Sequence, residues 1–220
     1  MIKGLIFDLD GVITETSEWH FLAWKKILKN YDIDYFSNEN NQLKGLNRID
    51  TLKAILKLKK INDWSIEKIN SVALAKNDYY LQLLNENLSS QNILPGIEQL
   101  IIDAKKNNLK LALASSSFNA KLILEKIGLL NNFDFIVDPK TIKKGKPDPE
   151  IFLKAAAGIN LKPEECLGFE DAIAGIQGLN AAKIKTVAIT NGIKNSEWEK
   201  AQFVFNTTEA IKLADLVKTK

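Results

Sequence analysis

The sequence is poor in the features that build disulfide scaffolds, membrane spans and basic binding patches. Its 220 residues include one cysteine, Cys166, so no intrachain disulfide can form, and we expect this thiol to pack in a buried strand. No apolar stretch is long enough to span a bilayer, and the first residues, Met1–Asp8, meet charge too early for a signal peptide. The net charge of +3 comes from lysines spread along helical stretches. These absences predict a soluble cytoplasmic protein with neither a nucleic-acid nor a membrane partner.

Short apolar runs alternate with helical patterns along most of the chain. Buried parallel strands are expected at Leu5 to Phe7, Leu109 to Ala114, Phe135 to Val137, Cys166 to Phe169 and Thr186 to Ile189. Helices are expected at Ile97 to Lys106, Ala120 to Ile127, Ile151 to Ala157 and Ala172 to Ala182. The alternation predicts an α/β fold with a doubly wound, Rossmann-like parallel sheet.

A different kind of sequence interrupts this alternation near the N-terminus. Residues 17–88 have a helical period and no convincing strand, which predicts a helical cap domain inserted into a core made of residues 1–16 and 89–220. The apolar stripes expected to be buried in this domain include Leu22, Ile66 and Tyr80. Trp19, Trp24 and Trp64 are expected in the core of that small bundle. Residues rich in Ser, Asn, Pro and Gly at both crossings predict a hinge.

Two carboxylates end the first predicted strand. Asp8 and Asp10 are two residues apart, so in an extended segment both face one side, while Leu9 faces the core. Gly11 then permits a sharp turn close to a ligand. An ordinary Asp-Gly turn would explain the same letters. Adjacent carboxylates repel each other, however, and a shared cation such as Mg²⁺ would hold both near one point.

The other predicted strand ends also carry polar side chains. Ser115, Ser116 and Ser117 follow the second strand, Lys146 precedes a helix, and Glu170 and Asp171 follow the fourth strand. Each group alone is explained as a turn or a helix cap. Together, at one edge of a parallel sheet, hydroxyls, a lysine and an acidic pair would bind a phosphate and a divalent cation.

These residues resemble the haloacid dehalogenase superfamily over nearly the whole chain. The resemblance implies that Asp8 attacks phosphorus to form an aspartyl phosphate and that Asp10 is the general acid and base. It implies that Ser115, Ser116 and Lys146 bind the transferring phosphoryl group. It further implies Mg²⁺ bound by Asp8, Glu170, Asp171 and the backbone carbonyl of Asp10.

Within this superfamily, the sequence most resembles the β-phosphoglucomutases. The matching segments include Asp8–Thr14 with Thr16 and His20, Leu43–Arg48, and Lys76–Asp78. The resemblance implies a monomer that interconverts β-D-glucose 1-phosphate and glucose 6-phosphate through glucose 1,6-bisphosphate. It implies that Thr16 supports cap closure. The implied ligands of the sugar and of its second, distal phosphate are His20, Lys44, Gly45, Arg48, Lys76, Ser117 and Asn119.

Alternatives stay open at this point. A sugar-phosphate phosphatase of the same superfamily needs the same core but no ligands for a distal phosphate, and a non-catalytic sugar-phosphate-binding module could keep the fold. His20 could be a packing histidine, and Arg48 a surface helix residue. The sequence departs from the mutase pattern at Asn47, Phe118 and Gly145. Phe118 stands in place of a lysine, and losing a charged contact costs on the order of 1 to 3 kcal/mol.

Overall fold

The computed structural model describes residues 1–43 and 45–217, which form two compact units. One unit combines Met1–Glu15 with the chain from Ser89 onward, and the other is Thr16–Leu88. The division falls one residue earlier than the sequence pattern suggested, so Thr16 belongs to the second unit. The units are referred to below as the α/β unit and the helical unit.

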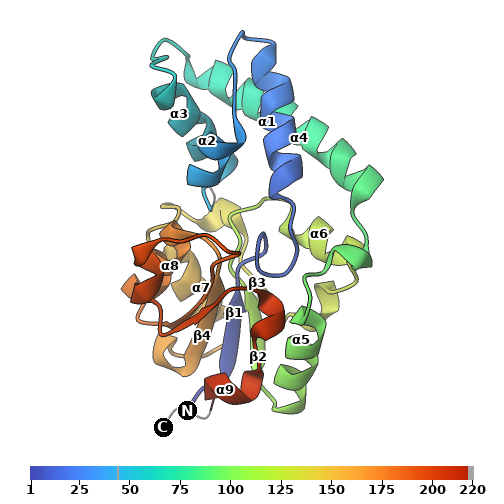
Figure 1. Ribbon diagram of the computed structural model, residues 1–220, viewed down its shortest axis with the longest axis vertical. Helices are drawn as coiled ribbons and strands as arrows, with labels where there is room; N and C mark the ends of the chain where they lie inside the picture. Colours follow the sequence, from blue (N-terminus) through green and yellow to red (C-terminus); the bar gives the residue numbers. More distant parts are fainter. Residues whose placement is uncertain (44, 218–220) are drawn as a thin grey trace. The chain divides into compact units, whose positions relative to one another are not determined.

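A parallel sheet forms the centre of the α/β unit (Figure 1). In the described residues it has six strands in the order β3-β2-β1-β4-β5-β6. Their bounds are β1 Gly4–Phe7, β2 Lys110–Leu113, β3 Phe135–Ile136, β4 Cys166–Glu170, β5 Lys185–Ile189 and β6 Phe203–Phe205. The predicted doubly wound fold is confirmed, and five strands lie where apolar runs were found. The edge strand β6 was not predicted.

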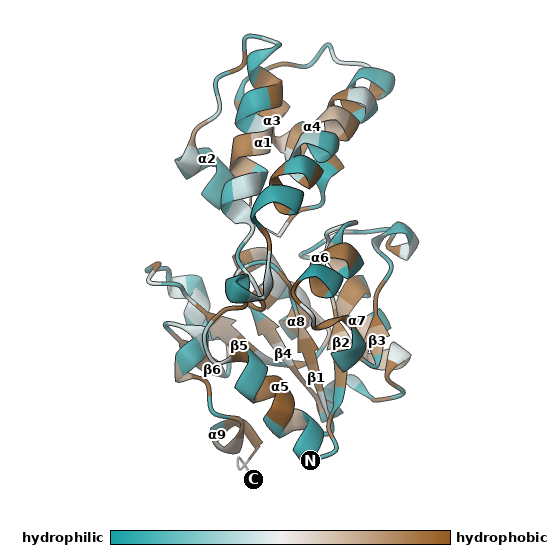
Figure 2. Cartoon of the chain, turned by 90° about the vertical axis from the view of Figure 1, so that its right-hand side faces the viewer, coloured by the Kyte–Doolittle hydropathy of each residue, from teal (hydrophilic) through white to brown (hydrophobic). Residues whose placement is uncertain are grey.

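Helices cover both faces of this sheet. The helix α5 packs against α9 and β2 on one face, whereas α7 and α8 pack together on the other (Figure 2). Their bounds are α5 Ile97–Lys106, α6 Ala120–Lys126, α7 Glu150–Gly158, α8 Ile173–Ala181 and α9 Leu213–Val217. Short 3₁₀ helices lie at Ser90–Asn92, Leu130–Asn132, Pro139–Thr141, Pro163–Glu165, Ser196–Lys200 and Thr208–Ala210. The strand order runs outward from β1 in both directions, so right-handed crossovers place helices on both faces.

One layer of the α/β unit's core lies between the central strands and the helices α7 and α8. Ile6 and Cys166 from the sheet contact Phe152 and Leu179 from these helices, and all four are buried. Burial raises the pKa of the Cys166 thiol to about 12. Cys166 is a free, buried member of this apolar cluster, which confirms the packing role expected for this residue.

The helical unit is built from α1 Ser17–Lys29, α2 Ser37–Gln42, α3 Arg48–Leu58 and α4 Ile66–Asn87. Its buried cluster includes Trp24, with Trp64 packed at the edge, as predicted. Trp19 is only half-buried. Leu22 and Ile66, expected on the buried stripes, are 39% and 51% exposed, because α1 and α4 turn these positions toward solvent. Among the described helices, none has both the length and the apolar content that crossing a bilayer requires.

The two chain segments that lead to the helical unit are hydrogen-bonded to each other. Thr14 forms an isolated antiparallel bridge with Ile93. The Thr14 hydroxyl donates to the Asn92 carbonyl at 2.8 Å, and the Leu94 N–H donates to the Ile13 carbonyl at 2.8 Å. The predicted hinge segments are therefore paired with each other where they leave the α/β unit.

Gly168 in β4 provides a test of how tightly this core is packed. A Cβ at this position would lie 2.2 Å from Cδ2 of Leu179, so we expect Gly168→Ala to lower the free energy of unfolding by about 1 to 3 kcal/mol through overpacking. Leu179→Ala alone should cost about 2 to 5 kcal/mol. In the double variant the loss should be at least about 1 kcal/mol smaller than the sum, because the shortened side chain on α8 leaves room for the new methyl group. Urea unfolding measures all four proteins, and additive losses would contradict this packing.

Candidate active site

Three buried carboxylates meet where β1 and β4 end. Phe7 pairs with Phe169, so the residues that follow them, Asp8 and Glu170, lie side by side. The exposed fractions of Asp8, Glu170 and Asp171 are 7%, 0% and 8%. Each offers a carboxylate oxygen, and these oxygens lie within 4.8 Å of one another. The parallel register therefore produces a compact acidic cluster from residues at distant places in the sequence.

Lys146 is the positive charge of this cluster. Its Nζ donates to Asp8 Oδ1 at 2.7 Å and to Glu170 Oε1, and the side chain is fully buried. The Nζ also lies 5.0 Å from the centre of the Phe152 ring, within cation–π range. Burial lowers the pKa of Lys146, but Asp8 and Glu170 more than offset this, and the pKa ends above its ordinary value. The ammonium form is the one that this site holds.

Both oxygens of the Glu170 carboxylate accept hydrogen bonds. One oxygen binds Lys146, and the other, Oε2, accepts from the backbone N–H groups of Asp171 and Ala172 at 3.1 and 3.2 Å. Burial raises the pKa of Glu170, whereas Lys146 acts in the opposite direction. The Glu170 carboxylate therefore connects Lys146 to the backbone of the turn that leads into α8.

Two glycines make room for the acidic pair. A Cβ on Gly175, in the first turn of α8, would lie 2.0 Å from Oε1 of Glu170. A Cβ on Gly11 would lie 2.0 Å from Oδ2 of Asp171, and Gly11 has φ +77°, which other residues rarely adopt. Both carboxylates therefore approach the backbone more closely than any side chain at these positions would allow.

The tight loop after β1 separates polar from apolar side chains. The Leu9 carbonyl accepts from the N–H groups of Val12, Ile13 and Thr14 at 3.3, 2.8 and 3.1 Å. Leu9 is fully buried, whereas Asp10 is half-buried. The expectation that Asp8 and Asp10 face the same side stays a prediction.

The serine loop follows β2, the neighbour of β1 on its other side. The buried Ser115 accepts through Oγ from the Ser117 N–H at 3.1 Å, and Ser117 Oγ accepts from the Asn119 N–H at 3.3 Å. Ser116 is half-buried, and Phe118 is 42% exposed. The Ala114 N–H donates to the Phe7 carbonyl at 2.8 Å, so this loop starts at the level of Asp8. The strand-end side chains of β1, β2 and β4 therefore share one edge of the sheet.

A second polar cluster lies inside the helical unit. The His20 ring stacks on Tyr80 with centroids 3.9 Å apart, and its Nδ1 contacts the Lys76 Nζ. Lys76 is 2% exposed, and its Nζ lies 5.2 Å from the Trp24 ring. The Tyr80 hydroxyl is 2.8 Å from Thr16 Oγ1. Thr16, His20 and Lys76 were predicted as functional residues, and Tyr80 contacts all three. Tyr80 itself was not predicted as a functional residue.

Burial and nearby positive charges favour the neutral form of His20. Burial lowers its pKa most, and the positive charges of Lys76 and Arg48 lower it further. An ammonium group only donates hydrogen bonds, so the His20 Nδ1 accepts from Lys76 and its Nε2 carries the proton. His20 therefore packs on Tyr80 and still offers one N–H donor.

Arg48 is the first residue of α3, and Asn47 caps this helix. The Asn47 side chain accepts from the N–H groups of Ile49 and Asp50 at 3.0 Å each. Serine and asparagine are both good N-caps, so Asn47 can replace a serine without loss of the helix start. Partial burial lowers the pKa of Arg48, while Asp78 opposes this. Gly45 has φ +84°, a conformation that favours glycine, and Lys44 lies outside the described residues.

Comparison with known proteins agrees with this geometry. The model of the haloacid dehalogenase-like hydrolase family matches residues 2–183. The chain belongs to this family. It is 42% identical to the β-phosphoglucomutase of Bacillus subtilis, over 87% of this chain and 84% of that protein. It is 30% identical to the fructose-1-phosphate phosphatase of Escherichia coli, over 84% of this chain and 95% of that protein.

A solved structure extends the similarity over both units. The crystal structure of β-phosphoglucomutase from Clostridium difficile superposes with a TM-score of 0.93 at 41% identity, covering 98% of this chain and 96% of that one. The haloacid dehalogenase-like fold of this chain therefore includes the helical unit as well as the sheet.

The acidic cluster suits a divalent cation. Asp8, Glu170 and Asp171 carry three negative charges when ionised, and Lys146 supplies one positive charge, which leaves two negative charges to be balanced. Carboxylate oxygens are the ligands that hard divalent cations prefer. Membership of the haloacid dehalogenase-like family also implies such an ion. The metal role expected for the Asp10 carbonyl stays a prediction.

The structure brings together part of the predicted site and adds residues to it. Asp8, Lys146, Glu170 and Asp171 meet as one cluster. Sequence reasoning missed the residues that shape the two clusters: Gly175, Phe152 and Tyr80. A signal for Gly175 was present, because two glycines three residues apart inside a helical pattern indicate close packing. Tyr80 was assigned only to an apolar stripe.

Replacing Gly175 tests whether the acidic pair binds metal. Because the new Cβ would displace the Glu170 carboxylate, Gly175→Ala should weaken binding of Mg²⁺ and Mn²⁺ by roughly 10- to 100-fold, as losses around metal ligands commonly do. Gln177→Ala, at an exposed position of the same helix, should leave it unchanged. Calorimetric titration with each ion measures the affinities. Equal affinity in wild type and Gly175→Ala would place the metal away from Glu170.

Proposed function

We propose that this protein is a Mg²⁺-dependent phosphosugar mutase that interconverts β-D-glucose 1-phosphate and glucose 6-phosphate. The intermediate would be glucose 1,6-bisphosphate, and the enzyme would alternate between free and phosphorylated Asp8. The observation that carries this proposal is identity above 40% with two β-phosphoglucomutases, one of which covers 98% of this chain. We further propose that the protein acts as a monomer in the cytoplasm.

The chemistry assigned to the α/β unit is phosphoryl transfer to and from Asp8. Phosphorylated Asp8 gives its phosphoryl group to O6 of glucose 1-phosphate, and Asp10 takes the O6 proton as the new P–O bond forms. The bisphosphate then turns over, and its 1-phosphoryl group moves to an oxygen of Asp8. Asp10 returns the proton to O1 as the old P–O bond breaks. The cycle leaves the enzyme phosphorylated and releases glucose 6-phosphate.

Charge stabilisation in this scheme comes from groups around Asp8. Lys146, already hydrogen-bonded to Asp8, would bind an oxygen of the transferring group together with Ser115 and Ser116. Asp8, Glu170, Asp171 and the Asp10 carbonyl would hold Mg²⁺, which supplies charge stabilisation to the phosphoryl oxygens.

Binding of the sugar and its distal phosphate is assigned mainly to the helical unit. The planar guanidinium of Arg48 suits a phosphate, and its place in the first turn of α3 puts it near backbone N–H groups that attract anions. His20 would offer its Nε2–H to the sugar, and Thr16 would support closure through Tyr80. The remaining proposed ligands are Lys44, Gly45, Lys76, Ser117 and Asn119.

A sugar-phosphate phosphatase is the second candidate. Similarity to a fructose-1-phosphate phosphatase of Escherichia coli favours it, and the cluster of Asp8, Lys146, Glu170 and Asp171 would serve hydrolysis equally well. Phe118 also removes a positive charge expected for the distal phosphate in the mutase subfamily. The two candidates differ in the fate of the phosphoryl group, which is either returned to the sugar or passed to water.

The products formed from one substrate separate the candidates. Purified protein given β-glucose 1-phosphate, Mg²⁺ and a trace of glucose 1,6-bisphosphate should form glucose 6-phosphate without stoichiometric free phosphate, because the aspartyl phosphate is passed to sugar. Coupled assays for glucose 6-phosphate and inorganic phosphate follow both products.

A variant of the proposed nucleophile, Asp8, serves as the control for this assay. Asp8→Asn should abolish turnover and the incorporation of labelled phosphate into the protein, since an amide does not form the acyl phosphate. Release of inorganic phosphate at a rate comparable with isomerisation would refute the mutase assignment. Labelling that persists in Asp8→Asn would refute the role of Asp8.

Arg48 tests the distal phosphate site. Arg48→Ala should lower mutase turnover by roughly 10- to 100-fold, because a hydrogen bond to a charged group contributes about 1.5 to 3 kcal/mol. Release of phosphate from a monophosphate sugar should change far less. Lys53→Ala, at an exposed position of the same helix, serves as the matched control and should leave both rates unchanged. Equal loss of both activities in Arg48→Ala would show that Arg48 does not distinguish the phosphates.

A further inference from the structure

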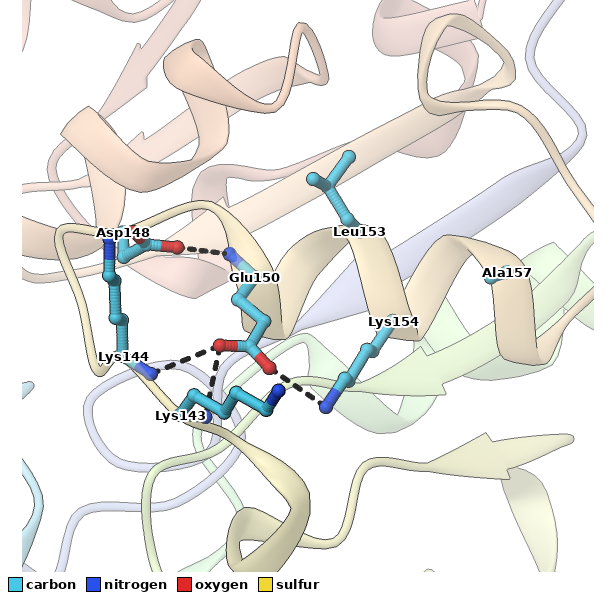
Figure 3. A pocket seen from close by; sticks show the side chains of 7 residues that line it. All are labelled: Lys143, Lys144, Asp148, Glu150, Leu153, Lys154 and Ala157. Carbon is cyan, nitrogen blue, oxygen red and sulfur yellow. Dashed lines mark hydrogen bonds and ion pairs between the residues drawn. The ribbon is translucent and has the colours of Figure 1, made fainter.

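The loop that carries Lys146 is tied to α7 by an acidic side chain. Oε2 of Glu150, the first residue of α7, accepts from the backbone N–H groups of Lys143 and Lys144 at 2.9 and 3.0 Å. Figure 3 shows this carboxylate between the loop and the Lys154 side chain. These two amides come two and three residues before Lys146, so the tie acts directly on the backbone that delivers this lysine.

The far side of the loop is closed by a second hydrogen bond to the same residue. The Glu150 N–H donates to Asp148 Oδ1 at 3.0 Å (Figure 3). The Asp148 N–H in turn donates to the Gly145 carbonyl at 3.0 Å. Backbone and side chain of Glu150 thus hold both arms of the loop around Lys146. A single residue at the helix start closes the loop from both sides.

A lysine secures the outer oxygen of this carboxylate. Lys154, one helical turn later, contacts Glu150 Oε1 at 2.8 Å and also donates to the Thr141 carbonyl. The Lys154 side chain and the backbone N–H groups of the loop lower the pKa of Glu150 to about 2. The carboxylate therefore stays ionised at ordinary assay pH, and hydrogen bonds to an ionised acceptor are the stronger kind.

Lys146 needs such support because its position is demanding. Its fully buried ammonium must reach both Asp8 and Glu170, yet the preceding residue is Gly145, whose backbone is the least restricted of all residues. We propose that Glu150 is a positioning residue that holds the Lys143–Lys144 backbone so that Lys146 meets the transferring phosphoryl group. This inference rests on the proposed function insofar as Lys146 acts in phosphoryl transfer.

Substitutions that change the length or the hydrogen-bonding capacity of the Glu150 side chain test this proposal. Glu150→Ala removes the acceptor of both loop amides, and kcat should fall roughly 10- to 100-fold, because small misplacements of catalytic groups have effects of this size. Glu150→Gln keeps an oxygen that can accept both N–H groups and should stay within about threefold of wild type. Lys154→Ala removes the ion pair but leaves those bonds, so it should also stay within about threefold.

A matched control separates positioning from general stability. Glu165, which immediately precedes β4, makes the same kinds of contact. Its Oε2 accepts from the Lys162 N–H at 3.0 Å, and its Oε1 binds Lys3 at 2.6 Å. Glu165→Ala should therefore lower the melting temperature without changing kcat. Wild-type kcat in Glu150→Ala, or an equal fall in Glu165→Ala, would overturn the positioning role.

A readout that does not need mutase activity completes the experiment. Hydrogen exchange of residues 143–149 should be faster in Glu150→Ala than in wild type and unchanged in Glu165→Ala, and inorganic phosphate should bind Glu150→Ala at least tenfold more weakly. If wild type releases phosphate instead of isomerising sugar, the proposed function fails while the same comparison of variants still decides the role of Glu150. Unchanged exchange and unchanged phosphate affinity would refute it.

Discussion

The buried ammonium of Lys146, hydrogen-bonded to Asp8 and Glu170, is the interaction on which the α/β unit's site depends. Removing one partner of a buried ion pair leaves the other charge uncompensated and costs about 3 to 5 kcal/mol of stability. None of the three residues can therefore be replaced without affecting the other two. One ammonium does not balance three carboxylates, and an approaching phosphate would be repelled by the remaining negative charge. A divalent cation at Asp8, Glu170 and Asp171 would remove that repulsion. Cation binding and phosphate binding should therefore be coupled.

Backbone geometry, more than side-chain flexibility, brings these charges together. The parallel pairing of Phe7 with Phe169 places Asp8 beside Glu170, and the missing side chains of Gly11 and Gly175 let carboxylates lie against the main chain. Lys146 comes from a loop instead of a strand, so its position has to be secured separately. The ties that Glu150 makes to this loop meet that requirement. Strands thus position the acids directly, whereas the lysine relies on a network of loop hydrogen bonds.

The sequence predicted what depends on local pattern and missed what depends on distant pairing. Apolar runs located β1 to β5, and side chains at strand ends indicated Asp8 and Glu170, because parallel strands end at one edge. Lys146 was indicated by its place just before a predicted helix. The contact of His20 with Lys76 joins two residues of α1 and α4 that are 56 positions apart in the sequence, and no periodicity predicts it. Leu22 and Ile66 fit an apolar stripe, yet they are exposed because the way the helices pack decides which face is buried. Glu150 was overlooked since an acid at a helix start is so common.

The choice between returning a phosphoryl group to sugar and passing it to water cannot be made by the acidic cluster, which serves both reactions. It depends on groups that retain the sugar and exclude water while the aspartyl phosphate exists, and the residues predicted for this task lie mainly in the helical unit. There, a neutral His20 is locked between Tyr80 and Lys76, so its one N–H points from a rigid ring instead of a mobile side chain. A rigid neutral donor suits a sugar hydroxyl, whereas a phosphate is better bound by a cation such as Arg48. This division between a neutral donor and a cation is what a sugar bearing two phosphates would require.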